Sequence, residues 1–247
     1  MWGIYDELID SIPEDLTVIK CMIVLTWTLV RSEAGVGTAM TMKSREGVGI
    51  KNIAGMKLKE LAAYAKSWNV TQAAIGQAAI NSALNTQRNV KSITGSYVEK
   101  TNNPKKLNAF SMLLPEIKGK NVAVIGHFPK IDELYRICNL SILERILQDG
   151  DFPDTACEYI LPVQDYVFIT GTAFINKTMP RLLQLSKNAK TILVGPSVPI
   201  SPILFKYGVN SIAGMVVVDE NMFWKGVQEG AKLNIFRHGG QMICINS

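Results

Sequence analysis

The stretch Asn121-Val-Ala-Val-Ile-Gly-His-Phe-Pro129 decides the fold that this sequence predicts. Residues 122–125 form a short, β-branched apolar run, which is typical of a strand buried on both faces of a parallel sheet. Gly126 then supplies a tight turn. The pattern predicts the first strand and crossover loop of a Rossmann-type domain, with a binding site near that loop.

The crossover loop lacks the other glycines of a dinucleotide fingerprint. In that fingerprint a second Gly lets the backbone approach a pyrophosphate, and a third lets the helix pack on the strand. Here these places fall on Phe128 and the residues around Lys130. The scaffold is therefore of a nucleotide-binding type, but ordinary NAD or FAD binding is not expected.

The composition is that of a globular protein in a reducing compartment. The 247 residues are 47% hydrophobic and 19% charged, enough to bury one large core or two modest ones. The longest apolar run, residues 21–30, is far shorter than the roughly 20 residues of a membrane span, and a secretory signal is not expected. The cysteines form no CxxC pair, so a cytoplasmic location is expected. The net charge of +5 is spread along the chain, which favours neither a nucleic acid nor a membrane as partner.

Alternating strands and helices after residue 120 predict the larger domain. Such alternation of apolar strands with helices predicts an α/β fold with a parallel, doubly wound sheet. The expected strands are residues 122–125, 140–143, 166–170, 191–194 and 211–218, and the expected helices lie near residues 131–138, 155–161, 179–185, 203–207 and 221–230.

Residues 1–100 predict a smaller α+β domain, with its strands before most of its helices. A polar, turn-rich segment then forms a linker at residues 101–120, and the Rossmann-like domain occupies residues 121–247. The elements expected in the smaller domain are a helix at 1–12, two strands within 16–31, a turn at 35–39, a strand at 40–45 and helices at 58–68 and 72–84.

Candidate binding residues follow the predicted parallel strands, because open sheets of this kind bind ligands outside the carboxyl ends of their strands. Glu144 stands where such folds commonly hold an acid for a ribose hydroxyl; the alternative is an exposed charge paired with Arg145. His127 could ligate a metal, carry a proton or bind a ligand, or it could simply cap the next helix. His238 is expected on the surface.

Other candidates are hydroxyl, amide and glycine positions. Residues 170–178 could form an anion site at a helix start or an ordinary cap, and the proline-rich loop 195–202 suits a rigid pocket wall. Asn81 lies among alanines and should have a partner. The full set of predicted ligand-binding residues is Gly35, Gly37, Thr38, Asn81, Gly126, His127, Phe128, Glu144, Thr170, Gly171, Thr172, Asn176, Gly195, Pro196 and Ser197.

No metal-binding motif can be read directly from the sequence. It contains no HExxH pattern, no CxxC pair, no nucleophile elbow and no P-loop, so catalytic residues are not assigned. His127, Glu144 and Cys157 are the best available metal ligands, with His127 the first candidate.

Several segments resemble an uncharacterised family named for heavy-metal chelation. They are Val124–Pro129, Leu143–Arg145, Ile169–Thr178 and Val194–Pro202, with Gly35–Ala39 and Ile75–Asn81 resembling the usual amino-terminal partner of that family. The resemblance covers almost the whole chain. It implies an amino-terminal domain similar to that of enolase, a Rossmann-like carboxyl-terminal domain, a site in the cleft between them, and a role in handling metals or metal chelates.

The sequence and the resemblance leave three functions open. The first is a small-molecule-binding protein or enzyme that holds a metal chelate, or an anionic or nucleoside-like ligand, between two domains. The second is a transferase with a nucleoside cofactor such as S-adenosylmethionine. The third is a non-enzymatic accessory protein of metal uptake. A metal ion or metal chelate is the implied ligand or cofactor, and homo-oligomer formation stays open.

Overall fold

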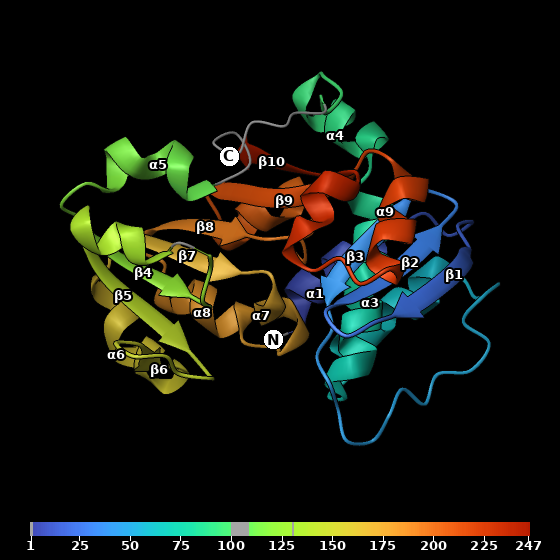
Figure 1. Cartoon of the computed structure of the whole chain (residues 1–247), viewed down its shortest axis with the longest axis horizontal. Coiled ribbons are helices and arrows are strands. Elements are labelled where there is room, and N and C mark those ends of the chain that lie inside the picture. Colours follow the sequence, from blue (N-terminus) through green and yellow to red (C-terminus); the bar gives the residue numbers. More distant parts are fainter. Residues whose placement is uncertain (1, 100–108, 130) are drawn as a thin grey trace.

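The computed structural model describes residues 2–99, 109–129 and 131–247. It is a mixed α/β structure with a large, mostly parallel sheet and a small antiparallel sheet, which lie beside each other (Figure 1). Within the described residues, no helix has both the length and the apolar character needed to cross a membrane.

The small sheet has the order β1-β2-β3, and helix α3 packs across β2 and β3. Asn69 begins α3 by accepting hydrogen bonds from the N–H groups of Thr71 and Gln72. The elements of this part are α1 (Gly3–Asp10), β1 (Val18–Ile23), β2 (Trp27–Ser32), β3 (Val36–Met40), α2 (Leu58–Ala63), η1 (Tyr64–Lys66), α3 (Val70–Leu84) and α4 (Gln87–Thr94).

The third strand corrects the sequence prediction, which placed a turn at 35–39 and a strand at 40–45. The strand is Val36–Met40, and residues 41–50 form no strand. Gly37 is what permits this, because a Cβ there would lie 2.1 Å from Ser82 N and 2.2 Å from Ala78 O. Gly35 and Gly37 together resemble a turn in the sequence, but the missing side chain of Gly37 serves close packing of β3 on α3.

The large sheet has the order β10-β9-β8-β7-β4-β5-β6, and its pairs are parallel except for β10 with β9. The chain places β5 and β6 on one side of β4, then returns to the other side with β7, so the strand order reverses between β4 and β7. The strands are β4 (Asn121–Ile125), β5 (Asn139–Glu144), β6 (Phe152–Pro153), β7 (Tyr166–Thr170), β8 (Lys190–Val194), β9 (Ser211–Val217) and β10 (Gly240–Asn246).

The predicted parallel strands are confirmed, but the two outermost strands were not expected. β6 has only two residues, and β10 lies in a segment whose glycines resemble a surface tail. Helix α5 (Ala109–Ile117) lies in the predicted linker, and residues 100–108 of that linker are outside the described residues. The remaining helical segments are η3 (Ile131–Arg136), η4 (Asp154–Ala156), α6 (Cys157–Ile160), η5 (Leu161–Val163), α7 (Thr172–Ile175), α8 (Met179–Leu185), η6 (Pro202–Tyr207), α9 (Glu220–Gln228) and η7 (Leu233–His238).

Buried contacts join the small sheet and its helices to the carboxyl edge of the large sheet. The Tyr5 hydroxyl donates to the carbonyl of Phe174, and the two rings pack edge to face with centroids 6.0 Å apart. Trp27 Nε1 donates to the Lys232 carbonyl at 2.9 Å, next to helix α9. The first part of the chain therefore contacts α7, which follows β7, and the segment that follows α9.

Candidate functional site

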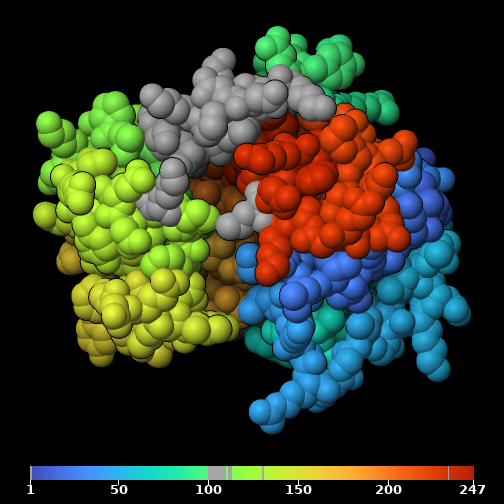
Figure 2. All heavy atoms as spheres, in the orientation of Figure 1, coloured from blue at the N-terminus to red at the C-terminus, as the bar shows by residue number. Residues whose placement is uncertain are grey.

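The carboxyl edge of the large sheet borders a hollow in the protein surface. Figure 2 shows this hollow near the centre of the face, with a floor in the orange-brown colour of β7, β8 and the loops after them. Its rim consists of the yellow-green region of β4 and β5, the red region of α9 and the blue region of the small sheet. Both parts of the chain thus contribute to one concave surface.

The loop after β4 is held closely against its neighbours. Gly126 has φ of +99°, and a Cβ there would lie 3.1 Å from Thr170 Cβ at the end of β7. Its N–H donates to the Leu143 carbonyl on β5. The Phe128 ring packs edge to face on Phe110, with centroids 5.3 Å apart. The predicted residues Gly126 and Thr170 are therefore neighbours at the point where strand order reverses.

His127 combines a fixed backbone with an imidazole nitrogen that lacks a hydrogen bond. Its N–H donates to Glu144 Oε2 at 3.0 Å. Its Nδ1 lies 3.5 Å from Asp151 Oδ2, which is close enough for an ion pair, but the contact does not meet hydrogen-bond geometry. The Asp151 side chain is only 1% exposed. A buried carboxylate therefore faces a buried imidazole nitrogen that has no hydrogen-bond partner in the described part of the chain.

Asp151 was missed by sequence reasoning, although it lies in a stretch that clearly predicts a turn. Its Oδ2 accepts from the Gln148 N–H at 2.9 Å, and its own N–H donates to the Gln148 carbonyl. The carboxylate closes this turn and faces His127 at the same time. Turn composition could have identified the residue as a turn former, but no spacing rule links it to His127.

Glu144 joins two loops through backbone contacts. Oε2 accepts from the His127 N–H, and Oε1 accepts from the Arg145 N–H at 2.7 Å. The Arg145 guanidinium pairs instead with Asp154, with Nε 2.9 Å from Oδ2. The side-chain pair Glu144–Arg145 that the sequence offered as an alternative is thus wrong, because Asp154 takes the guanidinium.

The hydroxyls and amides from Thr170 to Thr178 hydrogen-bond within their own segment. Thr170 Oγ1 accepts from Thr172 N at 3.4 Å and from Thr172 Oγ1 at 3.1 Å. Asn176 Oδ1 accepts from the N–H and hydroxyl of Thr178. These contacts are local turns, because the N-cap residues of α7 and α8, Gly171 and Thr178, form no side-chain cap hydrogen bond.

Lys177, in the same loop, is unusual in both backbone and side chain. Its φ is +68°, in the left-handed region that non-glycine residues seldom adopt. Its Nζ donates to the Ile175 carbonyl at 2.7 Å, and burial lowers the pKa of this amine to about 8. The amine therefore caps the end of α7 and is more easily deprotonated than an ordinary lysine.

Four amide side chains, Gln77, Asn81, Asn85 and Asn89, recur at every fourth residue and form an amide ladder along α3 and into α4. All except Asn81 bind main-chain atoms of the loop 195–202. The helix is interrupted between α3 and α4, where Thr86 has an extended backbone. Gln77 Nε2 donates to the Ser197 carbonyl, and Asn89 Nδ2 donates to the Ile200 carbonyl. Of these four residues, the sequence indicated only Asn81, for which a hydrogen-bond partner was expected. That partner is the Thr38 carbonyl, which accepts from Asn81 Nδ2 at 2.8 Å.

Asn85 is the central member of this amide ladder. Its Nδ2 donates to the carbonyls of Val198 and Met215, at 2.9 and 3.1 Å, and its Oδ1 accepts from the Ile200 N–H at 2.8 Å. The residue is 3% exposed. The main chain of the proline-rich loop is thus held by side-chain amides from the first part of the chain.

Ser197 and Gly171 also take part in the packing around the loop 195–202. Ser197 Oγ accepts from the Met40 N–H of β3 at 2.9 Å. A Cβ on Gly171 would lie 2.6 Å from Val198 N, so only glycine lets the loop approach the start of α7. The structure therefore brings Ser197, Gly171 and β3 together, as the sequence predicted, but through packing within the protein.

Thr38 keeps hydrogen-bonding capacity at the same place. Its hydroxyl is buried and has no hydrogen-bond partner among the described residues. Thr38 pairs with Leu29 across the small sheet, and Leu29 belongs to the core cluster that contains Val194 at the end of β8. Because side chains opposite each other share a face, Thr38 lies on the face of the small sheet that packs into this cluster.

The donor set does not fit a bare metal ion. In the part of the chain that the structure describes, no three His, Cys, Asp or Glu side chains form a group that could hold one. Cys157 lies in the core, where burial raises the pKa of its thiol to about 11, so it is not a ready thiolate. A metal at this site would need most of its ligands from elsewhere.

Family models and solved relatives agree with this architecture. The DUF364 model, described as "Putative heavy-metal chelation", matches residues 108–245, which is more than half of the chain. The chain belongs to the DUF364 family. A second model with the same description, DUF4213, matches residues 5–84.

Two relatives of the DUF364 family extend over nearly the whole chain. An uncharacterised protein of Methanocaldococcus jannaschii is 31% identical over 86% of this chain and 83% of its own length. The crystal structure of a family protein of unknown function from Desulfitobacterium hafniense has 38% identity and a TM-score of 0.91, covering 100% of this chain and 99% of that one. A family structure from Pyrococcus horikoshii, at 22% identity and a TM-score of 0.76 over 99% and 98% of the two chains, supports the fold alone.

Proposed function

We propose that the chain binds a metal chelate, that is, a metal ion already held by a small organic ligand, in the hollow at the carboxyl edge of the large sheet. The observation that carries this proposal is the His127 imidazole, whose Nδ1 lies 3.5 Å from the buried carboxylate of Asp151. Metal-binding histidines commonly have their second ring nitrogen oriented by a carboxylate. His127 would contact the metal through Nε2, and Asp151 would orient the ring.

A chelate suits this site better than a free ion. The family description refers to heavy-metal chelation. Within the described residues, however, the protein supplies no group of three metal-binding side chains. Borderline metals bind firmly only when several nitrogen, oxygen or sulfur ligands converge. A chelate brings these ligands itself and needs one coordinating side chain from the protein.

The finer description of the fold belongs to the same proposal. The order β6-β5-β4-β7-β8-β9 corresponds to the 3-2-1-4-5-6 order of Rossmann folds, which supports a Rossmann-like domain at residues 121–247. A three-stranded antiparallel sheet followed by helices supports an enolase-amino-terminal-like domain at residues 1–100. Ligand binding where the strand order reverses is the general behaviour of such sheets.

A transferase with a nucleoside cofactor is the second candidate, and the position of Glu144 at the end of β5 favours it. Both carboxylate oxygens already accept backbone N–H groups. Each oxygen still has a second lone pair that can accept a ribose hydroxyl. A metal-uptake accessory protein without catalysis would use the same chelate-binding step, and a cytoplasmic location is consistent with either role.

Calorimetry with Ni²⁺–nitrilotriacetate tests the proposal, because this chelate leaves coordination positions open for a histidine. We expect one chelate to bind per chain, and His127→Gln to weaken binding by at least about tenfold. His238→Gln is the matched control, since it removes the other histidine and should leave the affinity unchanged. Equal affinity of wild type and His127→Gln, or equal losses in the two variants, would contradict the proposal.

A further inference from the structure

A second concave surface lies outside the hollow, beside the turn between β1 and β2. It is a groove of about 450 Å³, within the roughly 300–1,000 Å³ range of small-molecule sites. None of the predicted site residues lines it. The groove is lined by Ile23, Val24, Leu25, Thr41, Lys43, Ser44, Gly47 and Thr71.

One wall of the groove is apolar and accessible. The Leu25 side chain is 65% exposed and Ile23 is 38% exposed, on either side of Val24. Single exposed apolar residues are ordinary, but three consecutive ones bordering a cavity offer a continuous surface to a hydrocarbon chain. This wall favours a ligand with an apolar part.

The opposite wall is held in place by hydrogen bonds. The Ser44 N–H donates to Thr71 Oγ1 at 2.9 Å, and that hydroxyl donates to the Met42 carbonyl at 2.8 Å. Asn69 Nδ2 donates to the Gly47 carbonyl at 2.9 Å. The loop that carries Lys43 is therefore fastened to the start of α3, and the groove is a built feature of the fold.

Lys43 is the group that can bind an anion in this groove. Across residues 2–99, 109–129 and 131–247, no carboxylate forms an ion pair with it. The Asn69 side chain already accepts from the N–H groups of Thr71 and Gln72, so the start of α3 does not offer these donors to a ligand. One ammonium matches one negative charge, whereas a phosphate usually needs several donors.

We propose that this groove binds a small amphiphilic carboxylate, such as a medium-chain fatty acid. The carboxylate pairs with the Lys43 ammonium, and the hydrocarbon chain lies along Ile23, Val24 and Leu25. The exposed apolar wall and the unpaired cation together select this class over purely polar anions and over uncharged apolar molecules. This site does not depend on the metal-chelate proposal, because His127, Asp151 and Glu144 do not line the groove.

An NMR titration of ¹⁵N-labelled protein with octanoate, hexanoate, 1-octanol and acetate tests this. We expect octanoate to shift the amides of residues 23–25 and 41–47, and to bind roughly five- to tenfold more tightly than hexanoate, because two methylenes are partly buried. Acetate should not bind measurably. Octanoate should exceed 1-octanol by roughly two- to fivefold, the range of an exposed ion pair.

Matched variants separate charge from apolar contact. Lys43→Gln should abolish the advantage of octanoate over 1-octanol, while Lys51→Gln, an exposed lysine of the same loop, should retain it. Leu25→Ser should weaken both ligands alike. The positions are exposed or at the protein surface, and thermal melts will verify folding. Equal binding of octanoate and 1-octanol to wild type, an unchanged Lys43→Gln variant, shifts confined to other residues, or no octanoate binding at millimolar concentration would overturn the proposal.

Discussion

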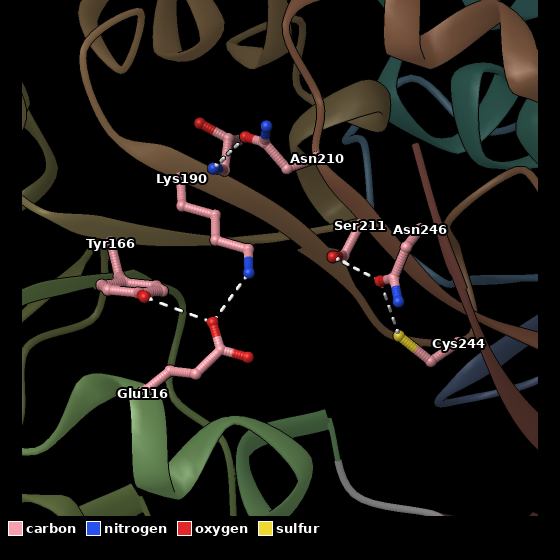
Figure 3. Close-up of polar contacts among 8 residues, drawn as sticks. Glu116, Tyr166, Lys190, Asn210, Ser211, Cys244 and Asn246 are labelled. Atoms are coloured by element: carbon pink, nitrogen blue, oxygen red, sulfur yellow. Dashed lines mark hydrogen bonds and ion pairs between the residues drawn. The ribbon is translucent and has the colours of Figure 1, made fainter.

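The two edges of the large sheet differ in how some of their polar side chains are paired. At the amino edge, the groups drawn in Figure 3 pair with one another: Glu116 Oε2 lies 2.8 Å from Lys190 Nζ, and the Tyr166 hydroxyl donates to the same carboxylate. The Ser211 hydroxyl donates to Asn246 Oδ1 at 2.8 Å. At the carboxyl edge, His127 Nδ1 and Thr38 Oγ1 are buried without hydrogen-bond partners among the described residues.

This difference teaches where the molecule keeps its binding capacity. A buried polar group without a hydrogen bond costs about 1–3 kcal/mol, so natural proteins contain few of them. Gln164 Oε1, just before β7 at the amino edge, is also buried without a partner among the described residues, so the contrast concerns the cluster in Figure 3 and not every side chain of that edge. The satisfied cluster favours a structural role, whereas the Asp151 carboxylate facing His127 Nδ1 fits the proposed ligand contact at Nε2.

The largest expected effect concerns the contact between the amide ladder and the loop 195–202. Asn85→Leu should lower the free energy of unfolding by about 4 kcal/mol, because it leaves two carbonyls and one N–H buried without partners. Urea unfolding followed by circular dichroism measures this. Arg88→Leu, an exposed change on the next helix, should shift the value by less than about 0.5 kcal/mol. A loss below 1 kcal/mol for Asn85→Leu would show that water replaces the amide.

A smaller effect is expected at the candidate site itself. Asp151→Asn should cost about 1–2 kcal/mol of stability, because the amide oxygen keeps the turn but loses the charge that strengthens the bond to Gln148. It should also weaken Ni²⁺–nitrilotriacetate binding by roughly tenfold through loss of the carboxylate that orients His127. Asp154→Asn, at a carboxylate about half-exposed to solvent, is the control for both measurements. Identical behaviour of the two variants would remove the special role of Asp151.

The smallest effect is expected at the amino edge. Hydrogen bonding to Lys190 lowers the pKa of Glu116, and the same bond raises the pKa of Lys190. Because the carboxylate pKa is depressed in the folded state, its contribution is complete above the ordinary value of 4.5 and is lost as pH falls through the lower folded value. The Lys190 contribution is complete below 10.5 and is lost as pH rises through its higher folded pKa.

Glu116→Gln should therefore change the melting temperature by less than about 2 °C at neutral pH, since exposed ion pairs stabilise little. The difference from wild type should shrink as pH falls below 4.5 and vanish below the lowered folded pKa of Glu116, where the carboxyl is protonated in both states. Thermal melts from pH 3 to 9 measure this. A neutral-pH loss as large as that of Asp151→Asn would break the contrast between the two edges.

Local patterns in the sequence predicted the strands of the large sheet, but not the contacts between distant segments. The apolar run of β4 and the ranges of β5, β7, β8 and β9 follow from composition alone. β3 was missed because Gly37 predicts a turn until α3 is placed against it. Asp151 was missed because its relation to His127 depends on the fold of the loop between them. The amide ladder, by contrast, could have been found from its four-residue spacing.

The amide ladder has a consequence for how this protein can vary between species. Gln77, Asn85 and Asn89 form their hydrogen bonds with main-chain atoms. Those atoms belong to Ser197, Val198, Ile200 and Met215, and the side chains of these four residues take no part in the bonds. Every amino acid has the same carbonyl, and every one except proline has the same N–H. The side chains of Val198, Ile200 and Met215 can therefore drift without matching changes in Gln77, Asn85 or Asn89, whereas the Ser197 hydroxyl is fixed by its own hydrogen bond from the Met40 N–H. Correlated substitutions in an alignment should be weak across this joint, even though it holds the two parts of the chain together.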